Sequence, residues 1–173
     1  MKKQPALSFW IDKLTNSIEN TISGDSFRTE VIRLSRADVK NLTKKNGWKF
    51  NWKKEFDNPA KEVYKLTIVN NPSIVQGLVS LEVKVDHVYM SLLESAPFNL
   101  GQNKLYEGVP ANLVAYACQM SFQRGFDGFV SFNAKTKLME HYTKTLGAVW
   151  EGGTLMVIYT DMARKLVEQY FKN

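Results

Sequence analysis

The stretch of sequence that decides the fold runs from residue 87 to residue 148. It reads HVYMSLLESAPFN at 87–99, LGQNKLYEGVPANLVAYACQMSFQRG at 100–125 and FVSFNAKTKLMEHYTKTLGA at 129–148. A nearly continuous apolar run of strand length, 88–93, is followed by Pro97, Asn99 and Gly101, which break regular structure. This part of the chain is therefore predicted to be a buried strand that leads into a loop.

A helix is predicted to follow that loop. Gly108, Val109 and Pro110 open it, and Gly125 is the expected stop, because glycine adopts the left-handed conformation without a Cβ penalty. Small and apolar residues recur on one narrow face of this helix, at Leu113, Val114, Ala117, Cys118 and Ser121. A short strand then ends in Asn133, and a second helix carries Tyr142 and closes at residues 146–148.

This order of elements resembles the acyl-CoA-binding core of the GNAT (acetyltransferase) superfamily. The resemblance is close over residues 87–148 and looser from Thr29 onward. It implies an α+β fold of the α/β sandwich type, with a mixed, mostly antiparallel central sheet and helices on both faces. Strands are expected at 63–69, 74–85 and 88–94, and the last of these is expected to pair in parallel with 129–133.

The remaining elements are predicted from local patterns. A hairpin with Gly152-Gly153 at its turn should join strands at 148–150 and 155–160. A final helix should begin at Asp161. Residues 29–173 are therefore predicted to form a single GNAT-like acyltransferase domain.

Residues 1–28 are predicted to be an N-terminal helical extension of that domain. Apolar residues recur at helical spacing between Pro5 and Ser23, at Leu7, Trp10, Ile11, Leu14, Ile18 and Ile22. The helix is expected to pack on the flank of the domain. A contact in a homodimer is the alternative.

Aromatic and polar residues alternate in a short segment of the first half of the chain. Trp48, Phe50 and Trp52 should share one face of an extended segment. Aromatic residues between lysines can stack bases while the ammonium groups meet phosphates, so an RNA-binding face is one interpretation. The other is that the aromatic face belongs to the core.

Composition limits the classes of function. The net charge of +6 points to an anionic partner such as coenzyme phosphates, nucleic acid or an acidic protein surface. No apolar run reaches the roughly 20 residues that span a bilayer, so we expect no membrane partner and a cytoplasmic location. Cys118 is the only cysteine, which excludes an internal disulfide, and its place on the buried helix face favours a core residue over a nucleophile. We expect no metal site.

The expected cofactor is acetyl-CoA, as acyl donor. A pyrophosphate needs several N–H donors that point one way, and a glycine-containing loop at a helix N-terminus supplies them. In the family pattern of Gln or Arg, two residues, Gly, one residue, then Gly or Ala, the matching positions here are Leu105, Gly108 and Pro110, so only the first glycine is kept. Pro110 lacks an N–H, and Lys104 or another nearby lysine is expected to compensate by charge. The predicted cofactor-binding residues are Leu92, Leu93, Lys104, Tyr106, Glu107, Gly108, Val109, Ala111, Asn112 and Asn133.

Three residues are predicted to be catalytic. Glu94, at the end of the central strand, is the best-placed carboxylate to take the amine proton, directly or through water. The alternative is a strand-end carboxylate that caps or pairs with a lysine. Asn133 matches a position where family members often contact cofactor or substrate. Tyr142 resembles the family tyrosine that protonates the leaving thiolate, although it precedes Gly147 by five residues rather than four. A packed aromatic is its alternative role.

The sequence therefore predicts an acetyl-CoA-dependent N-acyltransferase that moves an acetyl group directly to an amine acceptor of unknown identity. A non-catalytic GNAT-fold protein that binds a protein or RNA partner is the alternative, favoured by Pro110 and by the shifted Tyr142.

Overall fold

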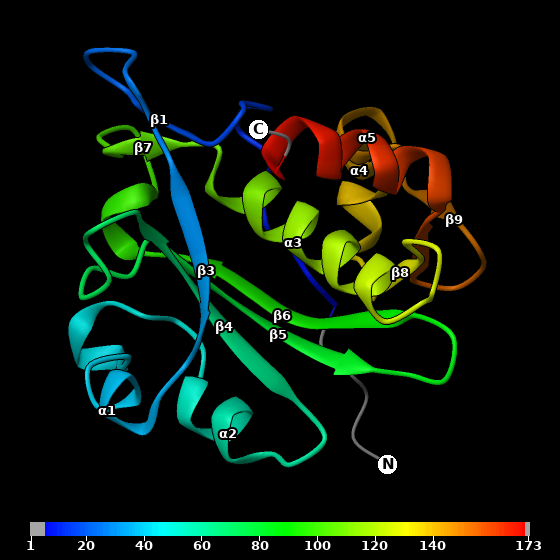
Figure 1. The fold of residues 1–173 in the computed structure, drawn as a ribbon, viewed down its shortest axis with the longest axis horizontal. Helices are drawn as coiled ribbons and strands as arrows, with labels where there is room; N and C mark the ends of the chain where they lie inside the picture. Colours follow the sequence, from blue (N-terminus) through cyan, green and yellow to red (C-terminus); the bar gives the residue numbers. More distant parts are fainter. Residues whose placement is uncertain (1–5, 172–173) are drawn as a thin grey trace.

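A seven-stranded mixed sheet runs through this computed structural model, which describes residues 6–171 (Figure 1). In spatial order its strands are β3 (Thr29–Arg33), β4 (Glu62–Ile68), β5 (Gly77–Val83), β6 (Val88–Ser95), β8 (Val130–Asn133), β10 (Leu155–Ile158) and β9 (Val149–Trp150). Neighbouring strands are antiparallel except β6 and β8, which run parallel. The predicted fold class is confirmed, including the parallel pairing.

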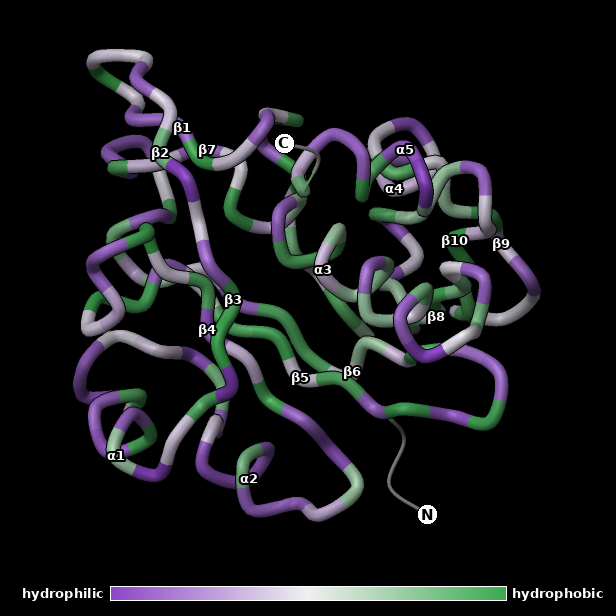
Figure 2. Tube along the Cα trace, in the orientation of Figure 1, coloured by the Kyte–Doolittle hydropathy of each residue, from purple (hydrophilic) through white to green (hydrophobic). Residues whose placement is uncertain are grey.

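Helices cover both faces of the sheet. On one face lie α3 (Val109–Gln123), α4 (Met139–Leu146) and α5 (Thr160–Phe171), and on the other lie the short α1 (Arg36–Val39) and α2 (Trp52–Asp57) (Figure 1). Hydrophobic residues predominate along β5 and β6 (Figure 2), and β6 is buried over its whole length because α3 packs on it. None of the helices within residues 6–171 has the length and apolar content that crossing a bilayer requires.

The pairing of β6 with β8 is short. Only Val88 with Val130 and Tyr89 with Ser131 are in register, and β6 then departs from its partner. The register between β5 and β6 shifts directly after this pair, so that Ser91 has no partner on β5. Such a bulge bends a strand, which accounts for a gap between the far ends of β6 and β8.

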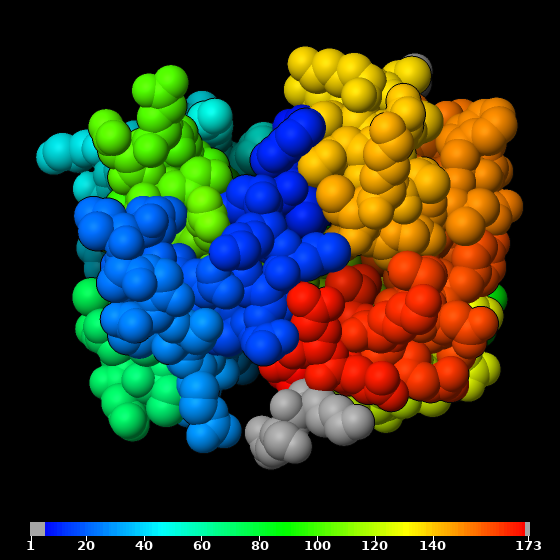
Figure 3. Space-filling view, turned by 90° about the horizontal axis from the view of Figure 1, so that it is seen from above, coloured from blue at the N-terminus to red at the C-terminus, as the bar shows by residue number. Residues whose placement is uncertain are grey.

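The prediction of an N-terminal helix is wrong. The described residues of this region, 6–28, contain no helix; instead β1 (Ile18–Asn20) forms a small sheet with β2 (Ser26–Phe27) and β7 (Tyr106–Glu107). Residues 6–16 are extended or irregular and lie between the two halves of the molecule (Figure 3, dark blue). Pro5, where the helix was expected to begin, is outside the described residues, and the domain boundary at residue 28 stays a prediction.

The prediction that Trp48, Phe50 and Trp52 share one face of an extended segment is also wrong in part. Asn51 caps α2 by accepting a hydrogen bond from the Lys54 N–H, so Trp52 begins a helix rather than continuing a strand. Trp48 and Trp52 are buried and only Phe50 is partly exposed, which agrees with the core interpretation and removes the three-residue stacking platform.

Gly108 holds the start of α3 against the N-terminal segment. It has φ +92°, and a Cβ at this position would collide with Thr15 Oγ1 and lie 2.8 Å from the Ser17 carbonyl oxygen. A side chain here is therefore disfavoured both by the left-handed backbone and by lack of space.

We predict that Gly108→Ala lowers the free energy of unfolding by about 3 kcal/mol, from left-handed strain and overpacking together. The matched control is Gly101→Ala, because Gly101 has φ +77° and open space around its Cβ position. That variant should lose only about 1 kcal/mol. Urea denaturation measures both, and equal losses would show that the close approach of Thr15 and Ser17 is unimportant.

Candidate active site

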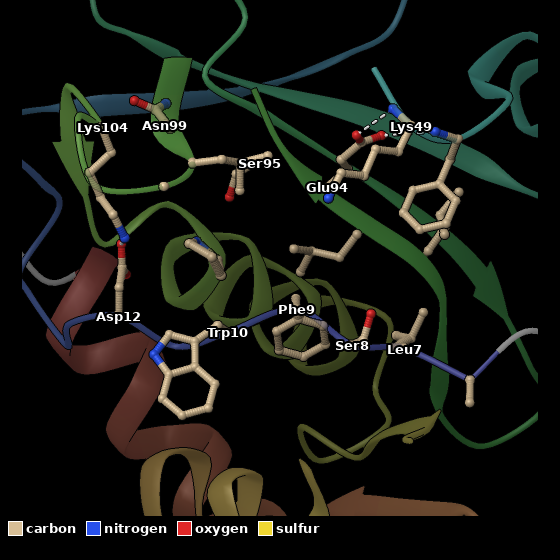
Figure 4. Close-up of a pocket in the computed structure, with 17 residues that line it drawn as sticks. Leu7, Ser8, Phe9, Trp10, Asp12, Lys49, Glu94, Ser95, Asn99 and Lys104 are labelled. Atoms are coloured by element: carbon tan, nitrogen blue, oxygen red, sulfur yellow. Dashed lines mark hydrogen bonds and ion pairs between the residues drawn. The ribbon is translucent and has the colours of Figure 1, made fainter. Parts of the chain in front are cut away.

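A cavity of about 360 Å³ opens where β6 departs from β8. One wall is the end of β6, Leu92 to Ser95; another is the N-terminal segment, Ala6 to Trp10 with Asp12 (Figure 4). The start of α3 and the loop before it contribute Pro110, Asn99, Leu100, Gly101 and Lys104, and the loop before α2 contributes Lys49 and Phe50. The cavity lies within the range of about 300–1,000 Å³ typical of small-molecule sites.

Of the predicted site residues, the structure brings four to this cavity: Leu92, Leu93, Glu94 and Lys104. Gly108 lies beside it through its backbone N–H. Tyr106 and Glu107 belong to β7, and the side chains of Val109, Ala111 and Asn112 are buried in the first turn of α3. Neither Asn133 nor Tyr142 lines the cavity.

Glu94 is 5% exposed and is held by three donors, two from the loop before α2 and one from the first residue of α2. The Lys49 N–H donates to Oε2 at 2.7 Å and the Phe50 N–H to Oε1 at 3.3 Å (Figure 4). The Trp52 indole N–H donates to Oε1 at 2.7 Å. The carboxylate therefore fixes the loop before α2 and the start of α2 onto β6. A carboxylate has about four acceptor sites, so one site is left for an amine or a water molecule.

Asn133 and Tyr142 are engaged elsewhere. The Asn133 side-chain amide donates to the Tyr89 hydroxyl at 2.7 Å and accepts from the Thr154 hydroxyl at 2.8 Å. Tyr142 is fully buried, and its hydroxyl donates to the Phe9 carbonyl oxygen at 2.6 Å. Burial raises the pKa of Tyr142. As placed here, Tyr142 is a packed aromatic, and a role as acid needs the Phe9 carbonyl to leave.

The N-terminal segment pairs with the open edge of β8. The Leu7 N–H donates to the Asn133 carbonyl at 2.7 Å, and the Lys135 N–H donates to the Leu7 carbonyl at 3.0 Å, which makes Leu7 a parallel bridge partner of Ala134. Leu7 therefore occupies the position beside β8 that β6 leaves.

Further along, the same segment is bound by α4. The Ile11 N–H donates to His141 Nε2 at 3.0 Å, and the Trp10 ring stacks on the His141 ring with centroids 3.7 Å apart. Burial lowers the pKa of His141, which favours the neutral ring that can accept this hydrogen bond.

Asp12 is bound at the start of α3. Its Oδ1 accepts from the Gly108 N–H at 3.1 Å. Its Oδ2 accepts from Lys104 Nζ at 3.1 Å (Figure 4). A carboxylate on an N–H at a helix N-terminus, with a lysine beside it, shows that this place is suited to an anion. In this structure the anion bound there is the chain's own Asp12 carboxylate, and the binding of a coenzyme pyrophosphate at this place stays a prediction.

The N-terminal wall of the cavity has no local signal in the sequence, because its partners lie 92 to 133 residues away. Lys49 and Phe50 were also missed as cavity residues, although their proximity to a capping Asn51 indicates a loop.

Residues 6–171 contain no group of three or more His, Cys, Asp and Glu side chains that could hold a metal ion. Burial raises the pKa of Cys118, which is consistent with an unreactive thiol.

We predict that Glu94→Ala lowers the free energy of unfolding by about 3 kcal/mol, because three donors lose a buried charged acceptor. The control is Glu140→Ala, which removes an exposed carboxylate paired with Lys144 and should change stability by less than about 0.5 kcal/mol. Chemical denaturation compares the two. A Glu94 variant as stable as the control would mean that the three hydrogen bonds do not hold the loop.

Comparison with known proteins identifies the fold but no sequence family. No family model and no curated protein sequence matches this chain. Mutant forms of the spermidine/spermine N-acetyltransferase SpeG from Vibrio cholerae match with a TM-score of 0.57 and 16% identity over 80% of this chain and 97% of that chain. The structure of AtaTR bound with AcCoA matches with a TM-score of 0.55 and 18% identity over 80% of this chain and 98% of that chain. The chain therefore has the GNAT N-acetyltransferase fold.

Proposed function

We propose that this protein is an acetyl-CoA-dependent N-acyltransferase that transfers an acetyl group directly to an amine. The observation that carries the proposal is the cavity between the parting strands β6 and β8, which has a buried carboxylate, Glu94, at one side and an anion site at the start of α3 at the other. The fold shared with N-acetyltransferases supports it.

The residues present fit the proposed cofactor. The Gly108 N–H and Lys104 would bind the pyrophosphate in place of the Asp12 carboxylate that they bind here. Pro110 supplies no N–H, so the lysine charge carries more of the binding. When bound, acetyl-CoA supplies an activated acyl group as a thioester.

The chain's own residues then have three tasks. Glu94 offers its remaining acceptor site to the amine N–H or to a bridging water and takes the proton. The Tyr142 hydroxyl, once released from the Phe9 carbonyl, supplies a proton to a leaving thiolate. Asn133 acts from the edge of β8 beside the cavity, where its carbonyl accepts the hydrogen bond from Leu7 in the closed arrangement.

We predict that acetyl-CoA raises the melting temperature of the purified protein and binds in calorimetry. At 100 times the dissociation constant, the gain in stability is about 2.7 kcal/mol. Turnover is then measured with a panel of amines by release of free coenzyme A. Absence of any binding at millimolar acetyl-CoA would remove the proposal.

A non-catalytic binding protein is the second candidate. It is favoured by the hydrogen bonds that already engage Glu94 and Tyr142. Binding of acetyl-CoA without acetylation of any amine in the panel would decide for it.

The charge distribution supports an anionic acceptor. Residues 36–54 contain seven of the 23 Lys and Arg and one of the 17 Asp and Glu, so the rest of the chain has sixteen of each and no net charge. A hollow of about 550 Å³ lies here, lined by Arg36, Lys40, Lys44 and Lys53 together with Val39, Leu42, Thr43, Phe50 and Asn51. Phe50 also lines the first cavity, so the two are adjacent. A polycationic acceptor is disfavoured at such a face, and an amine carried on RNA is favoured.

We predict that the protein is retained on RNA at low salt and that the double variant Lys40→Glu/Lys44→Glu weakens retention. The slope of log affinity against log salt should fall in magnitude by about 1.4, because two phosphate contacts on a single strand are lost. The control Lys135→Glu/Lys137→Glu makes the same charge change at two other exposed lysines and should keep the slope. Equal effects of both variants, or no retention at low salt, would contradict an RNA acceptor. A homodimer and a cytoplasmic location stay predictions.

A further inference from the structure

The N-terminal segment makes, one by one, the contacts that the proposed cofactor needs. The Leu7 main chain forms hydrogen bonds with the free edge of β8, and the Asp12 carboxylate accepts hydrogen bonds from the Gly108 N–H and Lys104. The Phe9 carbonyl oxygen accepts a hydrogen bond from the Tyr142 hydroxyl. The segment is thus bound to a slot whose donors and acceptors suit an elongated, partly anionic molecule.

This segment is held less firmly than a core element. Leu7 and Ile11 are buried, whereas Trp10 is 59% exposed and Leu14 is 41% exposed. Within the described part of the chain, no helix or strand covers its outer side in the view that faces it (Figure 3). Irregular segments with few buried apolar groups are the ones that open locally at low cost in free energy.

The segment ends at a firm anchor. The Thr15 N–H donates to the Tyr170 hydroxyl at 2.9 Å, and Gln169 donates to the Thr15 carbonyl at 2.8 Å. Beyond this point the chain enters β1, which pairs with β2 and β7. The part before Thr15 can therefore leave and return while its far end stays attached to α5.

We propose that residues 6–14 are a displaceable occupant of the acyl-CoA slot, which the cofactor must expel before the site becomes competent. The proposal rests on the proposed function and adds its regulation. Because the occupant belongs to the same chain, it competes with acetyl-CoA at a high effective concentration. The apparent dissociation constant for acetyl-CoA therefore equals the intrinsic constant divided by the fraction of molecules from which the segment has left the slot. Its departure also frees the Tyr142 hydroxyl, so opening of the slot and release of the candidate acid are one event.

The decisive experiment locks the segment in place. In the double variant Leu7→Cys/Ala134→Cys the two cysteines replace bridge partners on adjacent strands, about 4.8 Å apart, which is within the Cα separation that a disulfide spans. The native Cys118 is fully buried. Oxidised and reduced forms of the same protein are titrated with acetyl-CoA, so the reduced form is the matched control for folding.

We expect the reduced form to bind acetyl-CoA at least as tightly as the wild type, because the loss of the buried Leu7 side chain weakens the hold of the segment. The oxidised form should bind at least about tenfold more weakly than the reduced form. A second variant, Asp12→Asn, should bind about tenfold more tightly than the wild type, because the competing carboxylate is removed from Gly108 and Lys104. The control Asp25→Asn, at an exposed turn, should leave affinity unchanged.

Equal affinity of the oxidised and reduced forms would overturn the inference and leave the proposed function standing. Absence of binding in the wild type, the reduced form and the Asp12 variant alike would contradict both.

Discussion

The parting of β6 from β8 is the constraint on which the rest of the site depends. The two strands pair only over Val88–Tyr89 and Val130–Ser131, and the bulge at Ser91 then bends β6 away. A sheet that opens in its middle exposes main-chain donors and acceptors on both sides, and these groups must find partners. Here Leu7 satisfies main-chain groups on the β8 side. On the β6 side, the side-chain carboxylate of Glu94 is bound by the loop before α2 and by the Trp52 indole.

The same opening explains why one segment can serve both structure and function. The edge of β8, the start of α3, Lys104 and two side chains of α4 present polar groups to this opening, and each needs a partner. The N-terminal segment provides these partners in an order that follows its path along the slot, from Leu7 at β8 to Asp12 at α3. A ligand with a polar chain and a terminal anion could replace it group by group, which links the closed arrangement to cofactor binding.

Much of the fold was predictable because its signals are local. Gly108 and Gly147 have positive φ at the ends of helices, and Asn133 ends a strand as expected. The prediction of an N-terminal helix was wrong, because the same spacing of apolar residues also occurs in an irregular segment whose partners are distant in the sequence. Ile22, for example, fits the helical pattern but is 92% exposed. Of the site, the β6 end and Lys104 could be predicted, whereas the roles of Asp12 and Phe9 depend on contacts with residues about a hundred positions away.

Hydrogen–deuterium exchange with and without acetyl-CoA tests the central claim most directly, since it reports on the slot and its occupant at once. The account predicts that the amides of Leu7 and Ile11 lose protection when acetyl-CoA binds, because the partners of the segment are taken over. The amide of Thr15, which is anchored to Tyr170, should stay protected. Increased protection of Leu7 and Ile11 on binding would contradict the account, because the segment would then be a fixed wall of the site and not its displaceable occupant.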